Sequence, residues 1–239
     1  MTPDRLRQRL EFYRDLGVGD LYRRGAPALE PGPAPAQALA KDPGPAPAVE
    51  TLLNILEDIG PDCRRCRLSE GRSKIVFGSG NEQARLVFVG EGPGADEDAQ
   101  GLPFVGRAGQ LLTQMIENTA AKEGIPIRRP DVYICNVVKC RPPENRTPQP
   151  DEMEICGQFL SRQLRAIQPR AICALGSVAA KALLNTKDGV TRLRGQWHKW
   201  RGIPMRVTYH PSYLLRQYNQ EARREAWEDL KTVLHYVYD

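Results

Sequence analysis

Short runs of apolar and β-branched residues constrain the fold of this chain more than any other feature of its sequence. They span residues 85–90, 132–138, 170–176 and 205–209, and longer stretches with helical spacing separate them. The first three runs are apolar almost throughout, which is typical of strands buried on both faces of a parallel sheet. Alternation of such strands with helices favours crossover connections. We therefore expect an α/β fold, a three-layer α/β/α sandwich around a four-stranded parallel sheet.

The chain before residue 49 has a different composition. Residues 4–16 have the spacing of a short amphipathic helix, and residues 25–48 are mostly Pro, Ala and Gly, which favours an extended linker. We expect a helical extension over 1–24, a linker over 25–48 and the α/β domain over 49–239. No apolar run approaches the roughly 18 residues that span a bilayer, and the first residues lack the apolar core of a secretory signal. We therefore expect a cytoplasmic protein without a membrane segment.

Six cysteines in a chain without an export signal point to metal or cluster ligands rather than disulfides. Cys63 and Cys66 form a CRRC turn, and Cys140 and Cys156 can complete a set of four thiolates. This spacing fits tetrahedral zinc and a 4Fe-4S cluster equally well, and two unrelated buried thiols remain the alternative for the CRRC pair. Cys135 and Cys173 lie inside predicted strands, so we treat them as small buried apolar residues.

Basic side chains surround both halves of this predicted thiolate site. They can neutralise an anionic cluster or follow a phosphate backbone, and the net charge of +5 permits binding to a polyanion. The residues are Arg64, Arg65, Arg67, Arg72, Lys139, Arg141 and Arg146.

Polar residues or a glycine lie near or just past the ends of the four predicted strands. Glu91 lies in GEGPG, Asn136 in CNVVKC, Gly176 in ALGS and His210 in HPS. Ligands of parallel α/β sheets bind outside the carboxyl ends of the strands. The sequence therefore predicts a ligand pocket at this edge, where a polar residue marks three of the four strand ends.

Four segments, in this order and spacing, resemble the family 4 uracil-DNA glycosylases. They are CRRC from Cys63, GEGPGADEDAQGLPFVGRAGQLL over 90–112, NVVKCRPPENRTP over 136–148, and HPS from His210. The resemblance implies a DNA repair enzyme that hydrolyses the N-glycosidic bond of deoxyuridine. It also implies a 4Fe-4S cluster on Cys63, Cys66, Cys140 and Cys156, and it agrees with the fold expected above. The segment over 140–152 contains no histidine, so we expect turnover rather than covalent trapping on the abasic site.

The resemblance also assigns roles in recognising and releasing the base. Phe104 would stack on uracil, and the Asn136 amide would pair with its O4 and N3–H edge. His210 would donate to O2 as negative charge develops, while Glu91 would place the attacking water. The main chain at Gly92 would form part of the floor. The plainer alternatives are a core phenylalanine, an asparagine that caps a strand end, a structural histidine and a simple glycine-rich turn.

Further positions would select the base and hold the DNA. Glu97 would lie near uracil C5 and exclude the methyl group of thymine. Ser212 would bond a phosphate. A wedge would follow it into the gap left by the flipped nucleotide, formed by Tyr213, Leu214, Leu215 and Arg216; the two leucines could equally be helix core. We expect a monomer that acts on duplex or single-stranded DNA. A glycosylase of broader specificity and a nonenzymatic DNA-binding module are the alternatives.

Overall fold

The computed structural model describes residues 50–216 and 219–239. The predicted extension over 1–24 and the predicted linker over 25–48 therefore lie outside the described residues. The strands are β1 (Ser79–Gly80), β2 (Leu86–Gly90), β3 (Tyr133–Asn136), β4 (Ala171–Leu175), β5 (Trp197–Trp200) and β6 (Ile203–Thr208). The α-helices are α2 (Leu52–Ile59), α3 (Ala95–Gln100), α4 (Arg107–Lys122), α5 (Pro150–Ile167), α6 (Gly176–Leu184), α7 (Val190–Leu193), α8 (Pro211–Leu214) and α9 (Gln220–Tyr238). Short 3₁₀ turns are η1 (Arg67–Ser69), η2 (Arg129–Asp131) and η3 (Pro143–Asn145).

The described strands form one mixed sheet in the order β1-β3-β2-β4-β6-β5. Neighbouring strands from β3 to β6 pair in parallel, whereas β1 and β5 pair antiparallel at the two edges. The predicted α/β class is confirmed. The predicted number of strands was wrong, since the sheet has six strands and not four. The two edge strands were missed because β1 has only two residues and β5 carries polar and aromatic residues instead of an apolar run.

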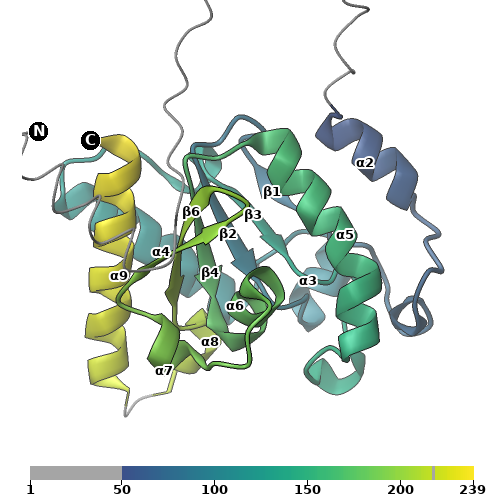
Figure 1. The fold of residues 1–239 in the computed structure, drawn as a ribbon. Coiled ribbons are helices and arrows are strands. Elements are labelled where there is room, and N and C mark those ends of the chain that lie inside the picture. Colours follow the sequence, from purple (N-terminus) through teal and green to yellow (C-terminus); the bar gives the residue numbers. More distant parts are fainter. Residues whose placement is uncertain (1–49, 217–218) are drawn as a thin grey trace, which may run out of the picture. The chain divides into compact units, whose positions relative to one another are not determined.

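Helices cover both faces of the sheet, with α4 and α9 on one face and α2 and α5 on the other (Figure 1). Alternate residues of β2 divide between the two layers: Val87 and Val89 pack in the core under α2 and α5, while Leu86 and Phe88 pack against α4 and α9. This division explains why the strand is apolar at every position. In the part of the chain that the structure describes, no helix combines the length and apolar character needed to cross a membrane.

The carboxyl ends of β4 and β6 approach each other closely. Gly176 follows β4 with φ +89°, and a Cβ placed on it would lie 2.9 Å from Cβ of His210. A side chain at position 176 would therefore separate the two strand ends. The loops after β2 and β3 meet at the same edge, where the main-chain N–H of Val138 donates to the carbonyl of Glu91 at 3.2 Å.

Candidate functional site at the carboxyl edge of the sheet

A cavity of about 570 Å³ opens at the carboxyl edge of the sheet. Seven residues predicted for the site contribute to its wall: Glu91, Gly92, Glu97, Phe104, Asn136, His210 and Ser212. Leu214, Arg216 and the four predicted cysteine ligands do not line it. The four strand ends therefore bring most of the predicted pocket together in one place.

Asn136 ends β3 and is almost fully buried, with 1% of its surface exposed. Its Oδ1 is buried and has no hydrogen-bond partner among the described residues. Position 90 on the neighbouring strand β2 requires glycine, since a Cβ on Gly90 would lie 2.4 Å from this oxygen. A buried acceptor without a partner costs about 1–3 kcal/mol, so Asn136 is suited to receive a donor from a ligand in the cavity.

Phe104 lies between the cavity and the core under α4, and its side chain is 6% exposed. Its ring centroid lies 5.6 Å from that of His210, with the planes inclined by 36°. The main chain of Phe104 has φ +53°, a left-handed conformation that costs an L-residue roughly 1–2 kcal/mol. Such strain is stored at functional sites when the surroundings enforce it.

His210 caps α8 and is held in one tautomer. The main-chain N–H of Ser212 donates to its Nδ1 at 3.2 Å, and the Ser212 hydroxyl lies 2.8 Å from the same atom. Nδ1 is therefore an acceptor, and the proton of the neutral ring is on Nε2. Burial lowers the pKa of His210 to about 4, so the ring is neutral at pH 7 and presents an N–H donor.

Glu91 follows β2 directly and lines the cavity. Burial raises the pKa of its carboxyl group, and a hydrogen bond from the Thr147 side chain opposes part of this rise. Next to it, Gly92 allows close packing of the loop, because a Cβ at this position would lie 2.8 Å from Cγ2 of Val138. Thr147 lies inside a family motif but had no predicted role, because its contact with Glu91 depends on how the loop over 141–149 folds against the cavity.

A bidentate ion pair fixes the loop that carries Thr147. Glu152 near the start of α5 is fully buried, and the two guanidinium amino groups of Arg146 donate to it at 2.6 and 2.8 Å. The main-chain N–H of Gln149 donates to the same carboxylate at 2.7 Å. The loop over 141–149 is thus anchored to α5. In this arrangement Arg146 is engaged by a carboxylate rather than directed only at solvent.

Glu97 organises the turn around the pocket. Its carboxylate accepts main-chain N–H groups from Gly94 at 3.1 Å and from Val105 and Gly106 at 2.9 Å each. These three contacts give the side chain a role in shaping the Phe104 loop. They do not test the predicted contact with uracil C5.

The structure corrects the predicted wedge at Leu214. This side chain is 1% exposed and packs with Ala222 and Ala226 of α9, so it is a core residue. Tyr213 beside it is 41% exposed and stacks on Tyr209, with ring centroids 5.3 Å apart. The exposed Arg216 places its guanidinium carbon 5.8 Å from the centroid of the Tyr213 ring.

All six cysteines lie in the described residues and are free. Cys140 and Cys156 are buried in the core under α5, and the half-buried Cys63 and Cys66 pack against the same core. Burial, with a smaller contribution from Cys156 and Cys66, raises the pKa of Cys140 to about 12. Within residues 50–216 and 219–239, no three His, Cys, Asp or Glu side chains form a group suited to one metal ion.

The basic residues near these cysteines have distinct environments. Arg72 lies 3.6 Å from Sγ of Cys140 and donates to the carbonyl of Cys63 at 2.7 Å, which suits a neutralising role. Arg65 pairs with Asp58 at 2.7 Å, and Arg67 pairs with Asp151. Both of these charges are already balanced by carboxylates.

Lys139 is fully buried, which excludes the predicted contact of this residue with a phosphate backbone. Its Nζ donates to the Asn136 carbonyl at 2.7 Å and to Oε1 of Gln163 at 2.6 Å. Its main-chain N–H lies 3.2 Å from Sγ of Cys156. Lys139 therefore connects the strand end at Asn136 with the cysteine region on α5, a link that spacing along the sequence could not indicate.

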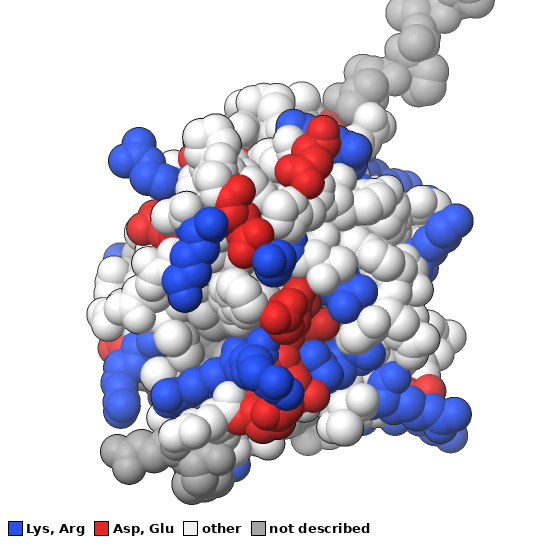
Figure 2. Space-filling model, turned by 90° about the vertical axis from the view of Figure 1, so that its left-hand side faces the viewer, with Lys and Arg blue, Asp and Glu red and all other residues white. Residues whose placement is uncertain are grey.

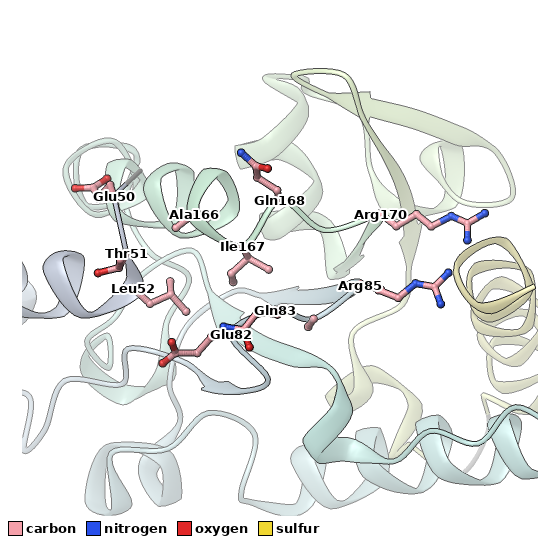
Figure 3. A pocket seen from close by; sticks show the side chains of 11 residues that line it. Glu50, Thr51, Leu52, Glu82, Gln83, Arg85, Ala166, Ile167, Gln168 and Arg170 are labelled. Carbon is pink, nitrogen blue, oxygen red and sulfur yellow. The ribbon is translucent and has the colours of Figure 1, made fainter. Parts of the chain in front are cut away.

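A second cavity, of about 440 Å³, lies at the amino ends of β2 and β4 (Figure 3). Arg85 and Arg170 border it, but their guanidinium groups point toward α9 and donate to the carbonyl of Val237. They cap the carboxyl end of that helix. None of the residues predicted for the site lies here, and this cavity shares no lining residue with the carboxyl-edge pocket.

The face over α9 carries basic and acidic side chains in mixture (Figure 2). Ion pairs contribute to this balance, including Arg194 with Glu225 at 2.8 Å and Lys231 with Glu123 at 3.1 Å. A phosphate backbone is bound by cations that release its counterions. This face does not present the continuous basic surface that such binding favours.

The fold and the pocket define an α/β protein with a polar, aromatic-walled cavity at the carboxyl ends of parallel strands. A family model described as the Uracil DNA glycosylase superfamily matches residues 77–231. The type-4 uracil-DNA glycosylase of Thermotoga maritima is 46% identical over 193 residues, which cover 79% of this chain and 96% of that protein. That of Archaeoglobus fulgidus is 43% identical over 193 residues, covering 77% and 92%. The chain belongs to the type-4 family of the uracil-DNA glycosylase superfamily, which confirms the resemblance found in the sequence.

A type-5 uracil-DNA glycosylase from Pyrobaculum aerophilum is more distant. It is 32% identical over 148 residues, which cover 56% of this chain and 64% of that protein.

Proposed function

We propose that this protein hydrolyses the N-glycosidic bond of deoxyuridine in DNA, releasing uracil and leaving an abasic site. The observation that carries the proposal is the buried Oδ1 of Asn136, which has no partner among the described residues and lies in the wall of a cavity shared with Phe104 and His210. A base must leave the duplex to reach such a cavity. Membership of the type-4 family supports the same reaction.

Asn136 would identify the base. Its Oδ1 would accept the N3–H of uracil and its amide N–H would donate to O4, which leaves both partners satisfied. Cytosine has an acceptor at N3 and a donor at C4, so it would face like groups. The contact from Lys139 to the Asn136 carbonyl supports this role, because it fixes the main chain from which the amide projects.

His210 would stabilise the departing base. Negative charge develops on uracil O2 as the bond breaks, and a donor already in place stabilises that charge without reorganisation. The neutral ring, with Nδ1 engaged by Ser212, keeps its proton on Nε2 for this purpose. Phe104 would stack on the ring of the base, a contact worth about 1–3 kcal/mol.

Glu91 would place and activate the attacking water. The ionised carboxylate can accept a proton from water and offset the positive charge of the oxocarbenium-like sugar. Its raised pKa brings the carboxylate closer to the pH range in which a general base is effective. Glu97 would narrow the pocket near uracil C5 while it holds the turn.

We propose that Cys63, Cys66, Cys140 and Cys156 hold a 4Fe-4S cluster. Cys140 and Cys156 lie in the core under α5 and Cys63 and Cys66 pack against it, and cysteine thiolates are the ligands that such a cluster takes. A bound cluster would cross-link the CRRC turn, the loop after β3 and α5, with Arg72 offsetting its negative charge.

Arg216 would contact the DNA backbone beside the pocket with its exposed guanidinium. The exposed Ser212 would bond a phosphate when its hydroxyl turns from Nδ1 of His210, which keeps the main-chain N–H of Ser212 as its donor. In this proposal the substrate is duplex or single-stranded DNA, and the acting species is a monomer in the cytoplasm. The loop over 141–149 offers no histidine nucleophile, which supports release of the abasic product. Residues 1–24 and 25–48 would be an appended helix and its linker, outside the catalytic domain.

The test is alkaline strand scission of oligonucleotides with one uracil, in single-stranded and duplex form. The purified protein should produce scission at uracil and none at thymine, and the variant Glu91→Gln should bind the same DNA with little scission. Parallel oligonucleotides with hypoxanthine or ethenocytosine measure the breadth of the substrate range. Binding without scission in every wild-type reaction would contradict an enzymatic function and favour a DNA-binding module.

A further inference from the structure

The main chain around Phe104 is held from both sides while Phe104 itself keeps a left-handed conformation. On the carboxyl side, Glu97 accepts the N–H groups of Val105 and Gly106 at 2.9 Å each. On the amino side, Arg129 donates from Nη2 to the carbonyl of Pro103 at 2.7 Å. The strained residue thus lies between two fixed peptide groups.

Arg129 is anchored along one face of α4. Its main-chain N–H donates to Oε1 of Glu117 at 3.2 Å, and its Nη1 donates to Oγ1 of Thr113 at 2.8 Å and to the carbonyl of Gly109 at 3.4 Å. These three partners are spaced by four residues, so they form one line on the helix surface. The arginine follows this line toward Pro103, and it does not contribute to the cavity wall.

Gly109 allows α4 to approach the Phe104 loop. A Cβ at position 109 would lie 1.9 Å from both the carbonyl carbon and the carbonyl oxygen of Phe104. Any side chain there would therefore displace the Phe104 peptide. The planar guanidinium of Arg129 suits this junction, because it reaches a carbonyl of the loop and two acceptors of the helix at once.

We propose that Arg129 is a positioning residue for uracil excision, which sets the ring of Phe104 for stacking by fixing the Pro103 peptide against α4. The inference rests on the proposed function. Arg129 contacts neither the base nor the DNA in this proposal. It acts only through Phe104, and Gly109 is the second requirement of the same junction.

The experiment is a double-mutant cycle between Arg129→Met and Phe104→Ala, with uracil release from an oligonucleotide as the readout. We expect Arg129→Met to lower kcat/KM about 10- to 100-fold, because small displacements of positioned groups have effects of this size. Free uracil should also inhibit the variant less strongly, with a higher inhibition constant, since the stacking contact involves the base alone. In the Phe104→Ala background the same substitution should have less than about a twofold effect, because the two residues act in series.

Controls separate this role from a general loss of structure. Arg128→Met replaces the exposed neighbouring arginine and should leave kcat/KM and uracil inhibition unchanged. Arg129→Lys should recover part of the activity, because lysine keeps the positive charge but lacks the two guanidinium amino groups that reach the loop and the helix at once. Gly109→Ala should reproduce the loss, and urea unfolding of each variant tests whether the fold is retained.

The outcomes are distinct. A loss for Arg129→Met that persists undiminished in the Phe104→Ala background, or free-uracil inhibition that does not change, would overturn the positioning role while the proposed function stands. A wild-type protein that releases no uracil would overturn both.

Discussion

The main-chain N–H of Ser212 donates to Nδ1 of His210 at 3.2 Å, and this contact fixes which ring nitrogen carries the proton. The neutral state follows from burial, which lowers the pKa of His210 to about 4. The folded protein therefore holds an imidazole N–H donor across the whole neutral range.

This lowered pKa predicts a pH-dependent contribution to stability. The unfolded chain binds a proton on His210 below about pH 6.5 and the folded chain only below about 4, so the folded state loses stability as pH falls through this interval. Between pH 7 and 4 the free energy of unfolding of the wild type should fall by about 2–3 kcal/mol more than that of His210→Gln. Urea titrations at both pH values measure this difference. Equal decreases in the two proteins would contradict the burial of a neutral ring.

The raised pKa of Glu91 predicts that the rate of uracil release falls at acidic pH, which gives an acidic limb in the plot of rate against pH. Burial holds the carboxyl group protonated above its usual range, so single-turnover uracil release should increase as pH rises past a midpoint above 4.5. Glu91→Gln should lower the rate about 10²- to 10⁴-fold, as expected for loss of a general base, and abolish this limb. A limb unchanged in the variant would assign it to another group.

Asn136→Asp keeps the shape of the side chain but removes the amide donor. We expect kcat/KM for uracil-containing DNA to fall about 10- to 100-fold, because the hydrogen bond from the amide to uracil O4 is lost and a carboxylate oxygen faces O4 instead. The ratio of uracil to cytosine release should fall with it. Competition between two labelled oligonucleotides measures this ratio, and an unchanged ratio would exclude Asn136 as the group that reads the base edge.

Tyr213 and Leu214 are expected to respond differently to truncation. Leu214→Ala should lower the free energy of unfolding by about 2–4 kcal/mol, since it opens a cavity between α8 and α9. Tyr213→Ala should change stability much less, because the ring is exposed, and should weaken binding to uracil-containing DNA. Urea unfolding and fluorescence anisotropy separate the two effects. A DNA-binding defect confined to a folded Leu214→Ala protein would restore the original wedge assignment.

If the protein holds a 4Fe-4S cluster, substitutions of two buried cysteines should differ in their effect on iron content. Cys156→Ser should lower the content of iron and acid-labile sulfide in protein purified without oxygen, because it removes a ligand. Cys173→Ser replaces a thiol buried in the opposite core and should retain the full content. Absorption spectra and metal analysis of the two variants provide the comparison. A colourless wild-type protein with stoichiometric zinc would contradict the cluster.

The sequence was a good guide to the central strands, since β2 and β4 lie within the apolar runs predicted for them. A strand buried on both faces is apolar at every position, and this can be recognised in the local sequence. The edge strands have no such pattern: β1 has two residues, and β5 is WHKW with an exposed end. Their pairing depends on neighbours far away in the chain.

The same distinction holds for the pocket. The strand-end rule and the family motifs brought Glu91, Asn136 and His210 to one cavity. They did not predict that Leu214 faces inward, because its partners on α9 follow only after the next loop. Nor did they reveal Arg129, whose contacts join η2 to the Phe104 loop and are invisible to spacing along the sequence.

The loop over 141–149 is already ordered in the free protein, since Glu152 holds Arg146 and the N–H of Gln149. Its conformational entropy is therefore lost during folding, and DNA does not have to order it on arrival. The charge of Arg146 is also compensated before DNA binds, so this residue contributes little to counterion release. A contact between DNA and Arg146 should therefore depend only weakly on salt, whereas Arg141 in the same loop, whose Nε donates to the neutral Asn145, keeps a charge that no carboxylate compensates among the described residues.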